Sequence, residues 1–410
     1  MEAMMKETSV KPRMASLGTY VAKKPKSLDP RKFPDEHFEL FSVPSHADGK
    51  PEVVEGKTVG ASKQMVEDDT VLLCKINPRI NRTWVVSSHT NHRKIASSEW
   101  MTFPPHPDFL PKYMGYYLRQ DELREYLSLN ASGVGGSLMR AKPSLIKDYP
   151  FPLFSLPEQG RIVEAIELQL GRLDAAVAHL HAAKAKLKRY KQAVLKAAVE
   201  GTLLYPDIEE GELPRGWKVV PVEAVGQIVT GSTPSKSVAA YYGDDHPFYK
   251  PTDLDAGYET IESTDGLTAA GLAEARVLPA KSILVTCIGA TIGKTGFIRT
   301  PGACNQQINA IVPNEHLVPE YGYFHCISPY FQKQIKDNAS ATTLPLLNKN
   351  RFKNLDFILP TKSDQLRIVK EVETRLAAVD EMDSTLDAQL LQATRLRQSV
   401  LKRAFEGRLV

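Results

Sequence analysis

One segment of this chain occurs twice: residues 161–204 recur as residues 367–410, at a constant offset and without a gap. About 17 of the 44 aligned residues are identical, whereas unrelated sequences would share about three. The agreement is strongest near the ends, where Glu200-Gly201 matches Glu406-Gly407. Because the two halves of a duplicated chain fold alike, this repeat indicates an internal pseudo-two-fold organisation.

Both copies have the spacing of a long helix that packs along a narrow stripe, with seam residues alternating in steps of four and three. In the first copy the seam is Ile166, Leu170, Leu173, Val177, Leu180, Lys184, Leu187, Lys191 and Val194. In the second copy it is Val372, Leu376, Val379, Asp383, Leu386, Leu390, Ala393, Arg397 and Val400. We predict two coiled-coil helices, each roughly 60 Å long at 1.5 Å per residue. The alternative is that each helix packs singly on a globular core.

The charged residues of the two seams predict how the helices pair. If the helices run antiparallel and end to end, Val194 meets Val372 and Lys184 faces Asp383. A parallel pairing would leave both charges against apolar partners, which is costly if they are buried. The sequence therefore predicts an antiparallel pair.

The segments between the helices repeat more weakly. Residues 70–86, TVLLCKINPRINRTWVV, align with residues 282–298, SILVTCIGATIGKTGFI, and both indicate a strand, a turn and a second strand. We therefore expect an α+β fold with two α/β domains, separated and joined by two long antiparallel coiled-coil helices. The expected order is a variable domain at 1–155, a helix at 156–204, a second variable domain at 205–358 and a second helix at 359–410.

The composition is that of an ordinary globular protein with a mild basic excess. The 410 residues are 42% hydrophobic and 24% charged, and the net charge of +4 is compatible with a polyanionic partner. Cys74, Cys287, Cys304 and Cys326 have no ligand-like spacing, so we expect no zinc site, no disulfide framework and a cytoplasmic location. No stretch approaches 18 uninterrupted apolar residues, which argues against a membrane span.

Motifs for catalysis are incomplete. Residues 289–295, GATIGKT, resemble a phosphate-binding loop, but the Walker pattern requires four residues between its glycines and this stretch has three. Acidic residues and a lysine within 35–57 resemble the metal-binding pattern of nucleases, yet the second half has no counterpart. His89 and His92 lie in a polar stretch typical of a surface loop. We therefore expect no catalytic residue, no metal and no cofactor on this chain.

Basic and amide side chains are concentrated in the stretches that look like loops. Lysine and arginine suit phosphates and guanine edges, whereas asparagine and glutamine can form two hydrogen bonds to adenine. The candidate DNA-binding residues of the first variable domain are Arg79, Asn81, Arg82, Arg93 and Arg140. Those of the second are Ser232, Thr233, Lys236, Lys250, Thr252, Lys294, Gln306 and Gln307. For any single residue the simpler interpretation is a solvated loop side chain. The hypothesis of DNA binding therefore rests on the loops as groups.

Four segments resemble the specificity subunits of type I restriction–modification systems. They are residues 156–166 (LPEQGRIVEAI), 195–203 (LKAAVEGTL), 216–236 (GWKVVPVEAVGQIVTGSTPSK) and 248–255 (FYKPTDLD). The alternation of variable domain and long helix, which covers nearly the whole chain, is also typical of that family. Residues 1 to about 68 depart from it, because they contain neither a Gly-Trp start nor a loop like GSTPSK.

This resemblance implies that each variable domain is a target-recognition domain reading one half of a bipartite double-stranded DNA site. Two methyltransferase subunits would dock on the helices, and restriction/translocase subunits would complete the complex. S-adenosylmethionine, ATP and Mg would be bound by those partners rather than by this chain. The alternatives are a coiled-coil scaffold or assembly protein whose variable domains bind protein, and an enzyme such as a nuclease.

Overall fold

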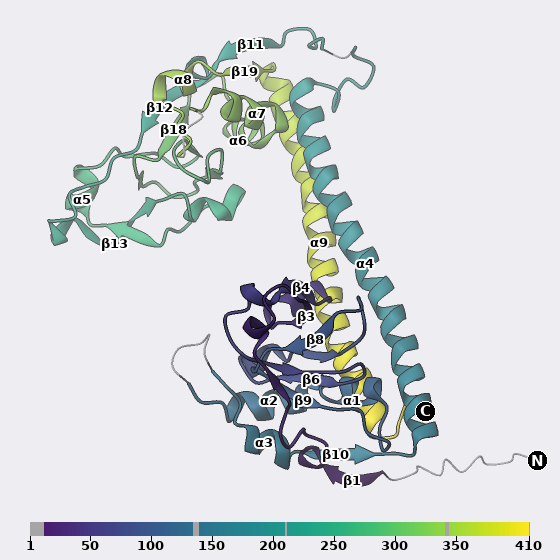
Figure 1. Cartoon of the computed structure of the whole chain (residues 1–410). Coiled ribbons are helices and arrows are strands. Elements are labelled where there is room, and N and C mark those ends of the chain that lie inside the picture. The colour runs from purple at the N-terminus through teal and green to yellow at the C-terminus, as the bar shows by residue number, and fades with distance from the viewer. Residues whose placement is uncertain (1–11, 134–138, 210, 341–343, 410) are drawn as a thin grey trace, which may run out of the picture. The chain divides into compact units, whose positions relative to one another are not determined.

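The computed structural model describes residues 12–133, 139–209, 211–340 and 344–409. It divides into two compact units: unit 1 is Met1–Leu180 with Ala388–Val410, and unit 2 is His181–Asp387. Each unit contains an α/β region and parts of two long helices, α4 (Leu156–Glu200) and α9 (Lys362–Phe405) (Figure 1).

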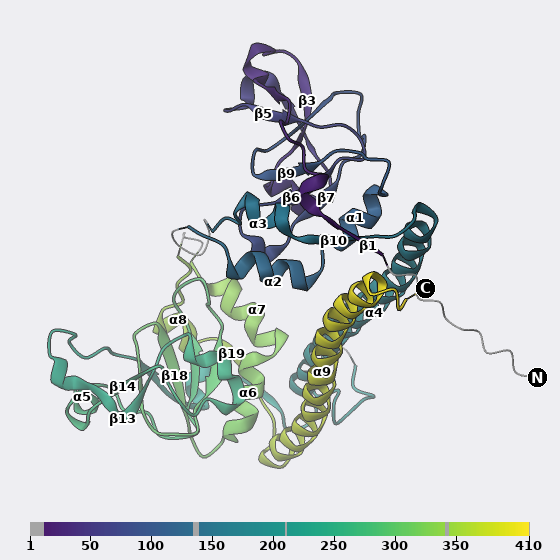
Figure 2. The same cartoon turned by 90° about the horizontal axis from the view of Figure 1, so that it is seen from below.

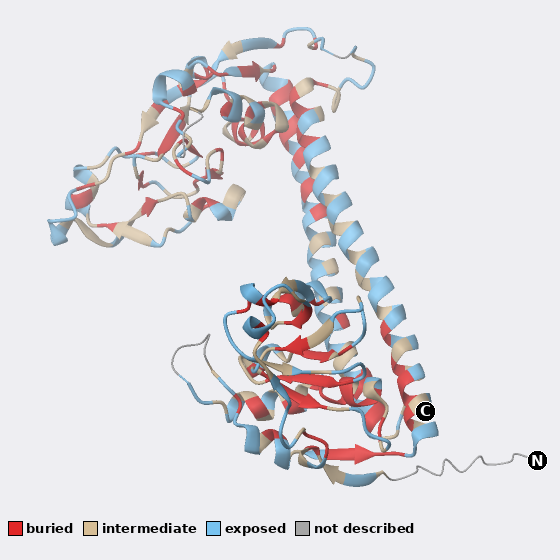
Figure 3. Cartoon of the chain, in the orientation of Figure 1, coloured by how far each residue is buried: buried red, intermediate tan, exposed pale blue. Residues whose placement is uncertain are grey.

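Among its described residues, unit 1 contains three sheets and three short α-helices. The five-stranded sheet has the order β2 (Ser27–Leu28), β5 (Lys63–Met65), β8 (Arg93–Ala96), β3 (His37–Phe41) and β4 (Glu52–Glu55). The other sheets are β7 (Thr83–Val85), β6 (Val71–Cys74) and β9 (Trp100–Phe103), and the pair β1 (Arg13–Ser16) and β10 (Pro150–Leu153). The helices are α1 (Pro111–Tyr117), α2 (Asp121–Leu129) and α3 (Pro143–Asp148). Strands β6 and β9 are buried along their whole length, as expected for short apolar runs (Figure 3).

Unit 2 is built in the same way. Its sheets are β14 (Asp265–Leu267), β13 (Tyr242–Tyr249) and β17 (Ala303–Cys304); β12 (Gly226–Thr230), β18 (Ile308–Pro313), β15 (Ile283–Thr286) and β16 (Thr295–Phe297); and β11 (Lys218–Pro221) with β19 (Asp356–Leu359). The short helices are α5 (Ala269–Ala273), α6 (Pro319–Ile327), α7 (Pro329–Asn338) and α8 (Lys349–Lys353). Its largest core joins the sheet around β15 to helices α6 and α7 and to the ends of α4 and α9 that belong to this unit.

The strand pairings repeat between the units. Val71 of β6 faces Val85 of β7, and the equivalent residue of β15, Ile283, faces Phe297 of β16. Strands β3 and β13 each have one antiparallel neighbour (β4 or β14) and one parallel neighbour (β8 or β17). The expected α+β fold class and its internal duplication are therefore confirmed.

The turns that follow β6 and β15 share an unusual backbone. Asn77 and Asn81 have φ angles of 51° and 49°, and at the same places in the second turn Gly289 and Gly293 have 108° and 89°. Left-handed backbone is open to glycine and, among other residues, to asparagine. Residues 289–295 thus belong to the connection between two antiparallel strands, which confirms the hairpin interpretation of GATIGKT.

Helices α4 and α9 run antiparallel in each unit. In unit 2, Lys184 Nζ lies 3.3 Å from Asp383 Oδ1, and in unit 1 Arg397 forms an ion pair with Asp174. Figures 1 and 2 both show the two helices side by side. The predicted antiparallel pairing and its contact between Lys184 and Asp383 are confirmed.

Burial along the seam is uneven. Val194 and Val372 are 3% and 0% exposed, because the core of unit 2 surrounds them. The side chains of Lys184 and Asp383 are 29% and 44% exposed, so this pair is not a buried polar contact. Ion pairs that remain in contact with water contribute little to stability. A parallel pairing of the helices would therefore cost less free energy than it would with buried charges.

Candidate nucleic-acid interface

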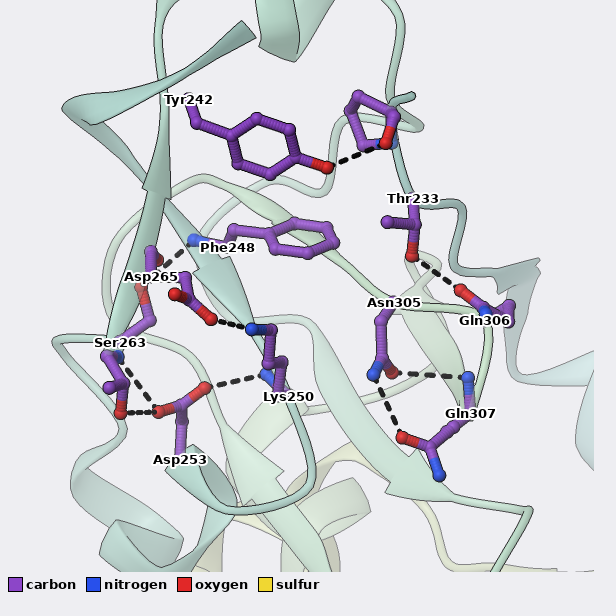
Figure 4. A network of polar contacts seen from close by, with 12 residues as sticks. Thr233, Tyr242, Phe248, Lys250, Asp253, Ser263, Asp265, Asn305, Gln306 and Gln307 are labelled. Carbon is purple, nitrogen blue, oxygen red and sulfur yellow. Dashed lines mark hydrogen bonds and ion pairs between the residues drawn. The ribbon is translucent and has the colours of Figure 1, made fainter. Parts of the chain in front are cut away.

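A polar pocket of about 560 Å³ in unit 2 brings together side chains from four distant segments (Figure 4). Its lining residues are Thr233, Lys236, Tyr242, Phe248, Lys250, Asp265, Asn305, Gln306 and Gln307. Five of the eight candidates named for this half of the chain are among them. Most of the residues that the sequence predicts for this half of the chain therefore lie in one pocket.

The pocket owes its shape to the close approach of two loops. The loop after β12 donates hydrogen bonds from Gly231 N to Ile308 O (3.0 Å) and from Ser232 N to Cys304 O (2.9 Å). A Cβ atom on Gly231 would lie 2.1 Å from the carbonyl oxygen of Asn305, so only glycine allows this contact. The two backbone bonds hold the GSTPSK loop beside the turn that carries residues 305–307.

Lys250 is oriented by two acidic residues. Its backbone N–H donates to Asp253 Oδ2 at 2.7 Å, and its ammonium forms an ion pair with Asp265 of β14. Asp253 in turn accepts two hydrogen bonds from Thr264, through the backbone N–H and the hydroxyl. The side chain of Lys250 is 34% exposed, so the ammonium stays accessible at the rim of the pocket.

The amide side chains of the turn are held as a group. Asn305 Nδ2 donates to Gln307 Oε1 at 3.0 Å, and the backbone N–H of Gln307 donates to Asn305 Oδ1 at 3.1 Å. The hydroxyl of Thr233 donates to Gln306 Oε1. Gln306 is exposed, and its side-chain oxygen already accepts this hydrogen bond. The pocket thus offers both ammonium and amide donors beside carboxylate acceptors.

Three other candidates of unit 2 lie outside this pocket. Ser232 is in the same loop, where its hydroxyl accepts a hydrogen bond from Arg276 N at 3.2 Å. Thr252 is exposed at the start of a 3₁₀ turn. Lys294, in the hairpin, lies 2.6 Å from Asp255 Oδ1.

The candidates of unit 1 fall into two groups. Arg79, Asn81 and Arg82 share the turn between β6 and β7. Arg93 and Arg140 lie elsewhere, and each is engaged by a carboxylate. A pocket of about 320 Å³ in unit 1, between Lys24 and Thr102, is lined by none of these five residues.

Arginine partners lower the pKa of two glutamates in unit 1. The hydrogen bonds from Arg93 hold the pKa of Glu36 below its usual value, and those from Arg140 do the same for Glu99. The guanidinium of Arg93 also lies 4.5 Å from the centre of the Phe33 ring. Because each arginine already has an anionic partner, its attraction for a phosphate is reduced.

Several residues of the pocket escaped the sequence analysis. Asp265 and Tyr242 carry no motif, and they reach the pocket only because β13 and β14 pair. Phe248 lies within FYKPTDLD and was not singled out from that segment. Asp265 could have been found as an acidic residue on a strand that pairs with the strand leading to Lys250.

The alternative metal sites are not supported by the geometry. His89 lies in a loop whose backbone donates to the buried carboxylate of Glu39, and His92 stacks on His37 with ring centres 5.5 Å apart. Within the described ranges, no three histidine, cysteine, aspartate or glutamate side chains are grouped as they would be around a metal ion. None of the helices described here is long and apolar enough to cross a membrane.

Comparison with known sequences points to one family. Residues 214–392 match the model of the type I restriction modification DNA specificity domain. The specificity subunit of the type I restriction enzyme HindI from Haemophilus influenzae is 34% identical over 200 residues, which are 48% of this chain and 42% of that protein. The specificity subunit of EcoBI from Escherichia coli is 28% identical over 308 residues, which are 69% of this chain and 64% of that protein. The matched regions thus span less than two thirds of either relative.

Solved structures share the fold. A chain from work on complex assembly and conformational transition of the type I R-M system superimposes with a TM-score of 0.79 at 19% identity, over 97% of this chain and 98% of the other. The HsdS subunit from Thermoanaerobacter tengcongensis gives 0.58 at 20% identity, over 97% of each chain. The family resemblance seen in the sequence is confirmed, and the coiled-coil scaffold is not favoured.

Proposed function

Because this chain is a relative of the type I specificity subunits, we propose that it reads the base sequence of double-stranded DNA on behalf of partner subunits. The pocket of unit 2 is the observation that carries this proposal. It presents lysine, glutamine and asparagine side chains together on loops that follow strands β12, β13 and β17. These are the groups that recognise phosphates and base edges in a DNA groove.

Within the pocket, the roles divide by chemistry. Lys250 suits the acceptor edge of guanine, because the ion pair with Asp265 positions its ammonium while the side chain stays partly exposed. Gln306 and Gln307 suit adenine, which offers a donor and an acceptor side by side. Lys236 is exposed on the GSTPSK loop and suits a phosphate.

The duplication supports a bipartite site. A protein with two similar reading domains is suited to two separated half-sites, as symmetric DNA-binding dimers are. Unit 1 and unit 2 would each read one half. The candidate residues differ in type, since those of unit 1 are four arginines and an asparagine and those of unit 2 are lysine, glutamine, serine and threonine, so the two half-sites would differ in sequence.

The long helices are the proposed docking surface for the methyltransferase subunits. They carry large apolar side chains that remain exposed, among them Tyr190 (46%), Met382 (56%) and Leu391 (54%). Exposed apolar groups of this kind mark surfaces that partners cover. Methyl transfer, ATP-driven translocation and cleavage would belong to the methyltransferase and restriction subunits, which would bind S-adenosylmethionine, ATP and Mg. The chain itself would be non-catalytic and would act in the cytoplasm.

Two experiments test this function. Methylome sequencing of a host with and without the gene should reveal a bipartite adenine-methylation motif that disappears on deletion. The purified chain should bind duplex DNA and should transfer no labelled methyl group from S-adenosylmethionine by itself. Transfer by the isolated chain would contradict the non-catalytic role, and a failure to bind DNA would favour the scaffold.

A further inference from the structure

The hydrogen bonds of unit 1 identify the turn that corresponds to residues 305–307 of unit 2. Ser97 N donates to Phe41 O at 3.2 Å, as Asn305 N donates to Tyr249 O at 3.1 Å. The parallel register agrees, because Phe41 faces Ala96 as Tyr249 faces Cys304. Residues 97–99, Ser-Ser-Glu, therefore stand where unit 2 has Asn-Gln-Gln.

The same comparison locates the counterpart of Lys250. Ser42 follows β3 as Lys250 follows β13, and its N–H donates to the side chain three residues on, Ser45 Oγ at 3.2 Å. Leu40 faces Glu52 across the antiparallel strands, just as Phe248 faces Asp265. Ser42 and Glu52 therefore occupy the places of Lys250 and Asp265.

The turn of unit 1 is also held by hydrogen bonds, although from a different donor. Gln64 Nε2 donates to Ser97 O and to Trp100 O, both at 2.9 Å. In unit 2 the carbonyl that corresponds to Trp100 O, that of Ile308, accepts from the backbone of Gly231. The backbone frame has thus been kept. Ser42 replaces Lys250 and residues 97–99 replace the amide side chains of 305–307, whereas the acidic residue of the paired strand, Asp265 or Glu52, is kept.

Ser42 orients the exposed carboxylate of Glu52. The hydroxyl of Ser42 donates to Glu52 Oε1 at 2.7 Å. The ion pairs described for strand β4 are made by Glu55, with His37 and Lys57, and not by Glu52. A carboxylate is repelled by phosphates, so its favourable partner in a DNA groove is the amino group of a base.

We infer that unit 1 reads its half-site through Glu52, positioned by Ser42, together with Ser98, and that Glu52 accepts a hydrogen bond from an exocyclic amino group of cytosine or adenine. This inference rests on the proposed DNA-reading function. It adds a recognition surface that differs from the basic turn of Arg79 and Arg82, and it makes the two half-sites chemically unlike.

The test is a selection of duplex DNA from a library of random base pairs by the full-length chain. The wild type should enrich a two-part motif. Glu52→Ala should reduce the preference for cytosine or adenine at one position by at least about fivefold, and should leave the other half of the motif intact. Ser42→Ala should weaken the preference at that same position, and Lys250→Met should alter only the other half. The base enriched by the wild type distinguishes cytosine from adenine.

Glu125→Ala, on the exposed face of α2, is the matched control and should leave the motif unchanged. Thermal unfolding of each variant verifies that it is folded. If Glu52→Ala leaves the motif intact while Lys250→Met changes it, the inference is wrong and the proposed function stands. If the wild type enriches no motif, both are wrong.

Discussion

Gln159 and Gln365 make the same three hydrogen bonds in the two units. Each side-chain oxygen accepts from the backbone residue that precedes a short helix, Leu110 N at 2.8 Å or Val318 N at 2.7 Å. Each side-chain nitrogen donates to two carbonyl groups, those of Asp108 and Phe154 in unit 1 and of His316 and Pro360 in unit 2. Both glutamines are buried, with 0% and 1% exposure. They tie the first turn of each long helix to the α/β region of its unit.

Gln365→Leu should lower the free energy of unfolding of unit 2 by about 2–3 kcal/mol, because buried backbone groups lose their partners. Urea denaturation monitored by circular dichroism measures the change. Gln392→Leu, at an exposed position of α9, is the control and should change stability by less than about 0.5 kcal/mol. Equal effects of the two substitutions would show that the hydrogen bonds of Gln365 contribute nothing specific.

Reversing the charge of Asp383 should have only a modest effect. Asp383→Lys should cost about 0.5–1 kcal/mol, since the pair with Lys184 is partly exposed, and Lys184→Asp in the same chain should recover part of the loss. A double-mutant cycle by thermal unfolding measures the coupling. The coupling should shrink in high salt. A loss without any recovery in the double variant would argue against the pairing.

Removing positive charge near the pocket should flatten the salt dependence of DNA binding. Lys236→Met and Lys250→Met should each reduce the slope of log affinity against log salt by about one unit for each lost phosphate contact. Fluorescence anisotropy with a labelled duplex at several salt concentrations gives the slope. Lys333→Met, on the exposed surface of α7, serves as the control. Unchanged slopes in both pocket variants would place the interface elsewhere.

Gly231→Ala should disrupt the pocket without unfolding the chain. The new methyl group would displace the turn at Asn305, and we expect DNA affinity to fall by about tenfold or more. Gly60→Ala, where an added Cβ meets nothing within 4 Å, should bind as the wild type does. Wild-type affinity of Gly231→Ala would show that the geometry of this turn is unimportant for binding.

His325 should make stability dependent on pH. Burial lowers the pKa of this histidine to about 3, and its Nε2 accepts a hydrogen bond from Ile358 N at 3.1 Å. In the unfolded chain its pKa is about 6.5, so below that value only the unfolded state takes up a proton. The contribution is therefore fully present above pH 6.5 and is lost as the pH falls toward 3.

Between pH 7 and pH 5 this histidine alone should cost about 2 kcal/mol of stability. Urea denaturation at both pH values should show a smaller drop for His325→Asn than for the wild type, although the variant is less stable at pH 7. Equal drops in the two proteins would mean that His325 is protonated in the folded state as well.

Local and periodic features could be predicted from the sequence because their causes are local. The steps of three and four along α4 and α9 reflect the helical repeat, and the charges at Lys184 and Asp383 predicted the antiparallel direction in which the two side chains meet. Because the two halves are duplicated, the strands indicated in one half predicted strands at the matching positions of the other half. The boundaries of the four expected segments stay predictions, as do the DNA-binding roles of the individual loop residues.

The sequence by itself therefore determined the two helices, their direction and the presence of polar loops between strands. Only the tertiary structure decided which side chains share a surface. Lys250 meets Asp265, and Arg140 meets Glu99, through strand pairings and loop contacts that leave no periodic mark in the sequence. The equivalence of Ser42 with Lys250 was hidden for the same reason: backbone hydrogen bonds preserve a position in space even when the side chain there has been replaced.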